Sequence, residues 1–190
     1  VIPPDGKVSK FTADWRQLET LEIETKFVDF NQDIQNKELA KNVNLRTVAN
    51  PFNEIFDLRI SYGLGKQSDS LLIYVPQYLN KLGTNTDDVT QFKNKLFQLG
   101  ASAFFTSTDN ELVLEIEGMD ENIDATLVLI QDFLKNINPT KEAIQTMAQE
   151  IESERKLSYK EASVLMKAAQ AYAVYGYRSS FLQEMPIKAI

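Results

Sequence analysis

The sequence contains no histidine and no cysteine, which limits the chemistry that its side chains can perform. Without imidazole and thiolate there is no Ser-His-Asp or Cys-His arrangement, no zinc–sulfur site and no imidazole ligand for zinc. Carboxylates, lysines, tyrosines and hydroxyls remain. Paired carboxylates can hydrolyse glycosides, but 27 Asp and Glu residues produce many chance pairs on a solvated surface. We therefore rank a carboxylate-dependent enzyme last among the functions considered.

One segment resembles a phosphate-binding loop. Residues 63–68 follow an expected strand and precede an expected helix, and they contain Gly63, Gly65 and Lys66. A P-loop needs Ser or Thr directly after the lysine, where Gln67 stands, and a dinucleotide loop needs a third glycine, where Ser68 stands. We interpret the segment as a strand-to-helix turn.

A second segment resembles a calcium loop. Asp120, Asn122 and Asp124 match the first ligands of an EF-hand, but Ala125 and Gln131 occupy the positions that need Gly and a bidentate Glu. We interpret these residues as the acidic start of a helix, where negative charge complements the helix dipole.

Length and charge define the broad class of the protein. The chain has 190 residues, of which 43% are hydrophobic, enough for one domain with a substantial core. The formal net charge is -7 and the basic residues are scattered, which disfavours nucleic acid, since Lys and Arg must neutralise its phosphates. No apolar stretch approaches the ~20 residues of a membrane-spanning helix. We expect one soluble folded unit with no nucleic-acid partner and no membrane span.

The elements that must position any site follow from periodicity and punctuation. Residues 1–22 are predicted to be an extended lead-in or linker, because Pro3-Pro4 and Asp5-Gly6 precede an isolated Trp15. Residues 23–190 are predicted to form a single domain. Alternating or β-branched segments predict strands at Glu24–Asp29, Glu38–Val48 with a break at Asn42, Phe56–Tyr62, Ala101–Thr108 and Leu112–Glu117.

Helices are predicted where apolar residues recur every three to four positions. They span Ser70–Leu82, with Pro76 starting or kinking the helix; a segment capped at Thr86-Asp87-Asp88 and stopped by Gly100; Asn122–Ile137; Lys141–Leu157; and a less regular helix ending at Gly176. The helices come in groups instead of alternating with parallel strands. This order favours an α+β fold, a mostly antiparallel sheet with helices packed on one face.

Several segments, taken in order, resemble the pitrilysin/insulinase family of zinc metallopeptidases, the inverzincins. They are Asn50-Pro51, the strand from Phe56, Leu79–Thr84 (LNKLGT), Leu96–Ala101 (LFQLGA) and Leu112–Asn122 (LVLEIEGMDEN). The resemblance extends roughly from Thr25 to Tyr177. It implies an insulinase-like metallopeptidase domain, usually somewhat longer than this chain, so we expect the end after Tyr177 to be incomplete.

In active members of that family, an H-x-x-E-H helix precedes a Gly-Thr pair, the two histidines bind zinc and the Glu acts as general base. Counting back from Gly83-Thr84 places this motif on residues 74–78, where Tyr74 and Tyr78 replace the histidines and Gln77 replaces the base. The tyrosines would still share a helix face, as ligands must. Neutral phenols are poor zinc ligands, however, and an amide takes no proton from water.

The family's third zinc ligand is a Glu on a later helix, which here falls among Glu150, Glu152 and Glu154. One carboxylate without histidines cannot assemble a zinc site. We therefore expect no catalytic residue, no metal ligand and no cofactor in this chain, and we expect Tyr74 and Tyr78 to be packing or rim residues.

The resemblance implies paired homologous domains in one polypeptide, in which one half holds zinc and the degenerate half closes over a peptide-filled chamber. We expect this chain to be such a degenerate domain, with other peptidase-like domains and peptide substrate as partners and the bacterial periplasm or cell envelope as location, the cytoplasm being the alternative. The competing hypothesis is a structural or assembly module, as in the family's respiratory-complex core subunits.

Overall fold

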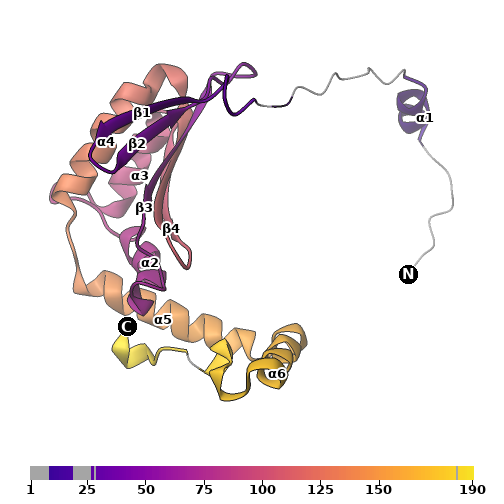
Figure 1. The fold of residues 1–190 in the computed structure, drawn as a ribbon, viewed down its shortest axis with the longest axis vertical. Helices are drawn as coiled ribbons and strands as arrows, with labels where there is room; N and C mark the ends of the chain where they lie inside the picture. Colours follow the sequence, from indigo (N-terminus) through magenta and orange to yellow (C-terminus); the bar gives the residue numbers. More distant parts are fainter. Residues whose placement is uncertain (1–8, 19–26, 28, 183) are drawn as a thin grey trace. The chain divides into compact units, whose positions relative to one another are not determined.

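The computed structural model describes residues 9–18, 27, 29–182 and 184–190. The chain divides into two compact units, Val1–Ala49 and Asn50–Ile190. Figure 1 shows the helices and strands of both units.

The first unit contains one helix and one hairpin. Helix α1 spans Lys10–Arg16, and its N-cap, Ser9, accepts a hydrogen bond from the backbone N–H of Thr12. This helix lies inside the predicted lead-in, so the prediction of extended chain is wrong there; the serine cap supplies a local start signal that we overlooked. None of its residues is buried.

The hairpin pairs β1 (Gln35–Ala40) with β2 (Val43–Thr47) in antiparallel fashion. Its turn contains Asn42, whose φ of 65° lies in the left-handed region that asparagine tolerates better than most residues. The predicted break at this residue is confirmed. The strand predicted at Glu24–Asp29 falls mostly on residues outside those described, and its boundary with the lead-in stays a prediction.

The second unit is built on a three-stranded antiparallel sheet in the order β3-β5-β4. The strands are β3 (Ile55–Tyr62), β4 (Ser102–Ser107) and β5 (Leu112–Met119). Leu114 pairs with Ile60 of β3 and with Phe105 of β4, so the three side chains project from the same face. The alternation that predicted β3 and the β4–β5 pair is confirmed.

Two helices, α3 (Val89–Gln98) and α4 (Ile123–Asn136), supply apolar side chains to that face of the sheet (Figure 1). The core combines residues from all five elements: Phe56, Phe92, Leu96, Phe105, Leu114, Ile116, Ile130 and Phe133. The rings of Phe92 and Phe133 stack with centroids 4.6 Å apart. The predicted α+β fold, a mostly antiparallel sheet with helices on one face, is confirmed.

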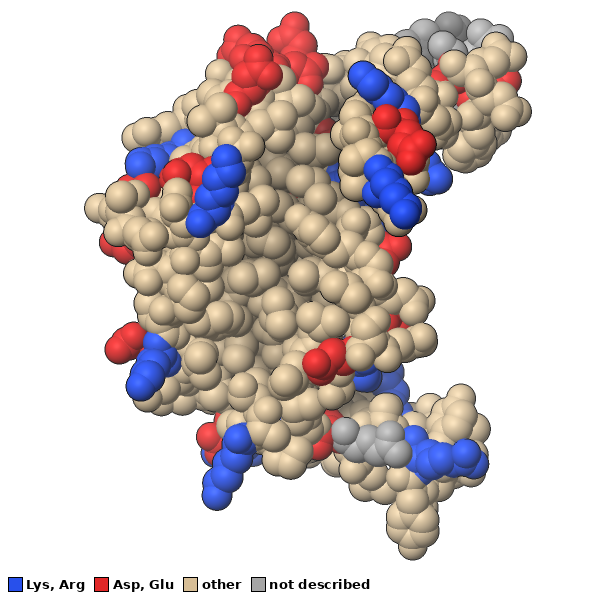
Figure 2. All heavy atoms as spheres, turned by 60° about the vertical axis from the view of Figure 1, so that its left-hand side comes forward, with Lys and Arg blue, Asp and Glu red and all other residues tan. Residues whose placement is uncertain are grey.

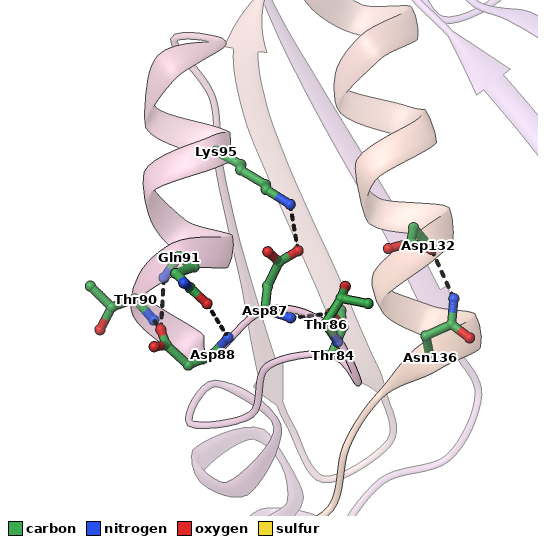
Figure 3. Close-up of polar contacts among 9 residues, drawn as sticks. All are labelled: Thr84, Thr86, Asp87, Asp88, Thr90, Gln91, Lys95, Asp132 and Asn136. Carbon is green, nitrogen blue, oxygen red and sulfur yellow. Dashed lines mark hydrogen bonds and ion pairs between the residues drawn. The ribbon is translucent and has the colours of Figure 1, made fainter.

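The start of α3 is fixed by a capping box. Asp88 Oδ1 accepts hydrogen bonds from the N–H groups of Thr90 and Gln91, and Gln91 Oε1 accepts one from the N–H of Asp88 (Figure 3). In the preceding turn, Thr84 Oγ1 accepts a hydrogen bond from the N–H of Asp87 at 3.0 Å. The predicted cap is therefore confirmed, with Asp88 as the residue that provides it.

The segment predicted as one helix from Ser70 to Leu82 is divided. A 3₁₀ turn covers Ser70–Ile73, and α2 covers only Val75–Leu79, with Pro76 in its first turn. Proline lacks an N–H and fixes φ, which suits the first turn of a helix and prevents continuation from the residues before it. The prediction that Pro76 starts a helix is confirmed. Helix α2 packs against β4 and α5.

The last part of the chain is helical. Helix α5 spans Lys141–Ser158 and starts at its N-cap Thr140, and α6 spans Ala162–Tyr175. Gly176, with φ 56°, ends α6 as predicted. Three short 3₁₀ turns follow, at Gly176–Arg178, Ser180–Leu182 and Ile187–Ala189. Among the described residues, no helix combines the length and the apolar composition needed to cross a membrane.

Candidate functional site

The glycine-containing loop after β3 packs against the β4–β5 turn. Its backbone N–H groups at Lys66 and Gln67 donate hydrogen bonds to the carbonyls of Thr108 and Asp109, at 3.2 and 2.8 Å. A Cβ atom at Gly65 would lie 2.5 Å from the backbone of Asn110, so this glycine permits the close approach. These N–H groups are therefore used within the fold, which agrees with our interpretation as a strand-to-helix turn.

The segment that resembles a calcium loop forms the entry to α4. Asp120 and Asn122 lie in a 3₁₀ turn, and Asn122 Nδ2 donates a hydrogen bond to the Leu99 carbonyl at 3.1 Å, joining this turn to the end of α3. The described residues contain no group of three or more His, Cys, Asp and Glu side chains arranged to hold a metal ion. The interpretation of an acidic helix start fits this geometry.

The residues at the degenerate motif positions lie at the junction of α2 and α5. Tyr74 stands in the turn before α2, and its hydroxyl accepts a hydrogen bond from Arg155 Nη2 at 3.0 Å. The hydroxyl of Tyr78 contacts the Thr140 carbonyl at 3.4 Å. Both tyrosines are half-buried, whereas Gln77 between them is exposed. Both are thus packing residues that join α2 to α5.

The two phenol oxygens do not converge on one point. Their partners, Thr140 and Arg155, stand at opposite ends of α5, fifteen residues apart, which is about 22 Å along a helix axis at 1.5 Å per residue. Tyr74 is the N-cap of α2, and its carbonyl accepts a hydrogen bond from the N–H of Tyr78 at 3.2 Å, so the two residues lie one helical turn apart. Their side chains both reach α5 but bond to its opposite ends, and a shared ligand face stays a prediction.

The chemistry of this donor set does not fit zinc. Ligands must meet at about 2 Å from one ion and be anionic or imidazole donors, whereas Tyr74 bonds to a guanidinium cation and Tyr78 bonds to a backbone carbonyl. No catalytic step through a metal follows from these residues.

The three glutamates proposed for the third ligand position have different surroundings. Glu150 forms an ion pair with Lys81, with Oε2 2.6 Å from Nζ. Glu152 pairs with Lys156 one turn later at 2.7 Å, and the hydrogen bond from this lysine lowers the pKa of Glu152. Glu154 lines the cavity beside Tyr74 and Gln77, and Glu150 and Glu154 both line a second cavity with Gln77. Glu150 and Glu154 thus both lie beside the degenerate motif.

Sequence reasoning missed Arg155, which is the centre of this region. Its guanidinium contacts Tyr74, the Met185 carbonyl at 2.8 Å and the Glu184 carboxylate at 3.4 Å, and its side chain is 20% exposed. A signal existed, since Arg155 follows the buried Ile151 by four residues and thus shares its inward helix face. Around it lies a cavity of about 730 Å³ between α2, α5 and the C-terminal segment.

The charges on one face of the molecule and the pKa shifts of two carboxyl groups bear on nucleic-acid binding and on carboxylate catalysis. On the face that Figure 2 shows, side chains of both signs lie mainly around the margin and no basic stripe crosses the middle. Glu111 and Glu152 both have a lowered pKa, in Glu111 because Ser61 and Arg59 donate hydrogen bonds to it. A carboxylic acid catalyst would instead need a raised pKa within a cavity.

The chain is similar to the peptidase M16 inactive domain from Pseudomonas fluorescens, with a TM-score of 0.67, 15% identity, and 79% of this chain and 37% of that chain covered. It is also similar to the periplasmic protease PqqL from Escherichia coli, with a TM-score of 0.56, 12% identity, and 83% and 20% covered.

A third similar structure is the ferredoxin protease FusC in complex with Arabidopsis ferredoxin, with a TM-score of 0.56, 12% identity, and 91% of this chain and 22% of that chain covered. No protein family matches the sequence, and no curated protein matches it. The chain spans less than two-fifths of the length of these structures. The similarity shows the fold: it is that of M16-type inactive domains and related proteases.

Proposed function

We propose that this chain is a non-catalytic, peptidase-like domain of a larger zinc metallopeptidase of the insulinase/pitrilysin type. In this role it forms part of the wall of a peptide-enclosing chamber and contacts the substrate. Another domain of the parent polypeptide binds the zinc and hydrolyses the peptide. The partners of this domain are then the other peptidase-like domains of the same polypeptide and the peptide itself.

The observation that best supports this proposal is the pair of divergent tyrosines. A fold similar to M16-type domains has phenols at the two motif positions, and these phenols bond to opposite ends of α5. Such side chains stabilise the packing of α2 on α5 and supply neither a metal site nor a base. A domain without a metal site or a general base can contribute binding surface to a larger protein, but no catalytic group.

The sizes of the similar proteins support the second half of the proposal. The chain covers 37%, 22% and 20% of the three structures, so each of them contains much additional polypeptide. One is named an inactive domain and two are named proteases. We extend the proposal to a location in the bacterial periplasm or cell envelope, since PqqL is described as periplasmic. Fractionation of cells that express the parent protein tests this location.

A peptidase assay tests the lack of catalysis. The purified chain is incubated with zinc and a mixture of internally quenched peptides, with and without a chelator. We expect no chelator-sensitive hydrolysis. Turnover that the chelator abolishes would refute the proposal.

Removal of this domain from the parent protein tests the chamber role against the assembly role. If the domain contacts substrate, its deletion lowers peptide hydrolysis while the zinc-binding half stays folded, as measured by zinc content. Unchanged hydrolysis together with lost association of the remaining domains would favour the assembly module.

A further inference from the structure

The C-terminal segment runs back along α5 toward α2 and reaches the cavity beside Tyr74 (Figure 1). We call residues 184–186 the strap. They have no regular secondary structure, and Glu184, Met185 and Pro186 all line the cavity. The strap therefore forms one wall of the space into which Gln77 and Glu154 also project.

Two residues at the end of α5 hold the strap by polar contacts. Arg155 Nη1 donates a hydrogen bond to the Met185 carbonyl at 2.8 Å, and Arg155 Nε lies 3.4 Å from Glu184 Oε2. The hydroxyl of Tyr159 donates a hydrogen bond to the same carboxylate oxygen at 2.8 Å. Apart from a local hydrogen bond between Ala189 and Pro186, these are the polar contacts of the strap within the described part of the chain.

This arrangement has the chemistry of a bound peptide. The Met185 carbonyl accepts a hydrogen bond that any peptide backbone could accept. The Glu184 carboxylate is contacted by a guanidinium and a phenol, and arginine side chains recognise acidic motifs in the same way. The cavity of about 730 Å³ is also lined by Lys66 and Ser70, which offer further donors beyond the strap. A volume of this size is typical of a ligand site.

We propose that the cavity between α2, α5 and the strap is a binding site for an extended peptide segment that contains an acidic residue, and that the strap occupies part of this site in cis. Arg155 and Tyr159 recognise the acidic residue. A peptide in trans and the strap compete for them, so the strap keeps the site closed until it is displaced. This inference goes beyond the chamber role, because it concerns binding alone and holds whether or not a parent protein hydrolyses peptides.

The small number of contacts makes displacement feasible. Segments held by few interactions open at a low cost in free energy compared with the core. The strap is tethered, so it competes at a high effective concentration, which can reach the millimolar range for short tethers. If it is docked about nine-tenths of the time, the apparent affinity for a peptide in trans falls about tenfold.

The test uses the full chain and a fluorescently labelled peptide with the sequence of residues 180–190, SFLQEMPIKAI. Fluorescence anisotropy measures its binding to the unaltered chain, to Glu184→Ala and to Glu184→Lys. We expect both variants to bind about tenfold more tightly than the unaltered chain. Glu121→Ala, which removes an exposed carboxylate elsewhere, is the matched control and should bind like the unaltered chain.

Two further measurements identify the site. In the Glu184→Ala chain, Arg155→Met should abolish the gain in affinity, and a peptide with alanine at the position of the glutamate should bind at least tenfold more weakly. The methyl resonance of Met185 provides a check on unaltered protein: excess peptide should shift it toward its position in the Glu184→Ala chain by displacing the strap. Equal affinities for the unaltered chain and Glu184→Ala, a gain that survives Arg155→Met, or a Met185 resonance that peptide does not shift would each overturn the proposal.

Discussion

The carboxamide of Asn80 pairs with the backbone of Phe105 through two hydrogen bonds. Asn80 Nδ2 donates to the Phe105 carbonyl at 3.0 Å, and the Phe105 N–H donates to Asn80 Oδ1 at 2.8 Å. Strand β4 is an edge of the sheet, so these backbone groups point away from β5. The side chain of one residue thus takes the place of a neighbouring strand and attaches the end of α2 to the sheet.

Asn80→Ala is expected to destabilise the chain by about 1–3 kcal/mol, because the N–H and carbonyl of Phe105 lose their partners in a half-buried position. Urea unfolding measures the effect. Asn94→Ala, at an exposed position of α3, is the matched control and should change the free energy of unfolding by less than about 0.5 kcal/mol. Equal effects of the two substitutions would contradict the role assigned to Asn80.

Gly65→Ala is expected to destabilise the chain by about 1–3 kcal/mol, since the added methyl group overlaps the backbone of the β4–β5 turn. A Cβ atom there would lie 2.5 Å from both Asn110 N and Asp109 O. The neighbouring Gly63 has no atom within 4 Å of its would-be Cβ, so Gly63→Ala serves as the control. Thermal unfolding compares the two; a Gly65→Ala chain as stable as Gly63→Ala would show that the loop does not approach the turn.

Tyr159 is expected to ionise at a higher pH than free tyrosine. Its hydrogen bond to Glu184 raises the pKa of the phenol above its usual value near 10. The phenol therefore contributes stability that is complete below about pH 10 and disappears as the pH rises through the raised pKa. The difference between the ultraviolet titration curves of the unaltered chain and of Tyr159→Phe isolates the ionisation of this phenol. In Glu184→Ala its midpoint should fall; an unchanged midpoint would mean that the two side chains do not meet.

A chain with Tyr74→His, Gln77→Glu and Tyr78→His is expected to bind far less than one zinc ion. The side chains at positions 74 and 78 reach opposite ends of α5, and Arg155 adds a positive charge beside position 74. Zinc content after dialysis measures the outcome. The control chain has Glu152→His and Lys156→His, because these exposed side chains already meet one turn apart on α5. One zinc ion per molecule in the triple variant, and more zinc than in the control chain, would show that the side chains at positions 74 and 78 can converge on one ion.

The sequence predicted the second unit well where the signal is local. The alternation in Phe56–Tyr62 identified β3 because one face of that strand is buried, and Asp88 and Gly176 marked helix ends through hydrogen bonding and backbone conformation alone. The lead-in was harder, since α1 is only seven residues long and buries none of them.

The candidate site was only partly predictable, for reasons of distance along the chain. The resemblance to a motif identified Tyr74, Gln77 and Tyr78, but it did not predict which groups their side chains contact. Arg155 bonds to a residue 81 positions away and to another 30 positions away, and no periodicity in the sequence encodes such pairs. Helical spacing placed Tyr74 and Tyr78 one turn apart, as the hydrogen bond from the Tyr78 N–H to the Tyr74 carbonyl shows, but it does not specify that their hydroxyls bond to opposite ends of α5.

By itself, the sequence determined what this chain lacks: with neither imidazole nor thiolate, its side chains offer few ways to bind zinc or to activate a nucleophile. Only the tertiary structure decided what takes their place. Packing of α2 and the C-terminal segment on α5 brings Tyr74, Arg155 and Glu184 together around one cavity. These contacts depend on how whole elements bury their apolar faces against one another, which residue types and local spacing do not specify.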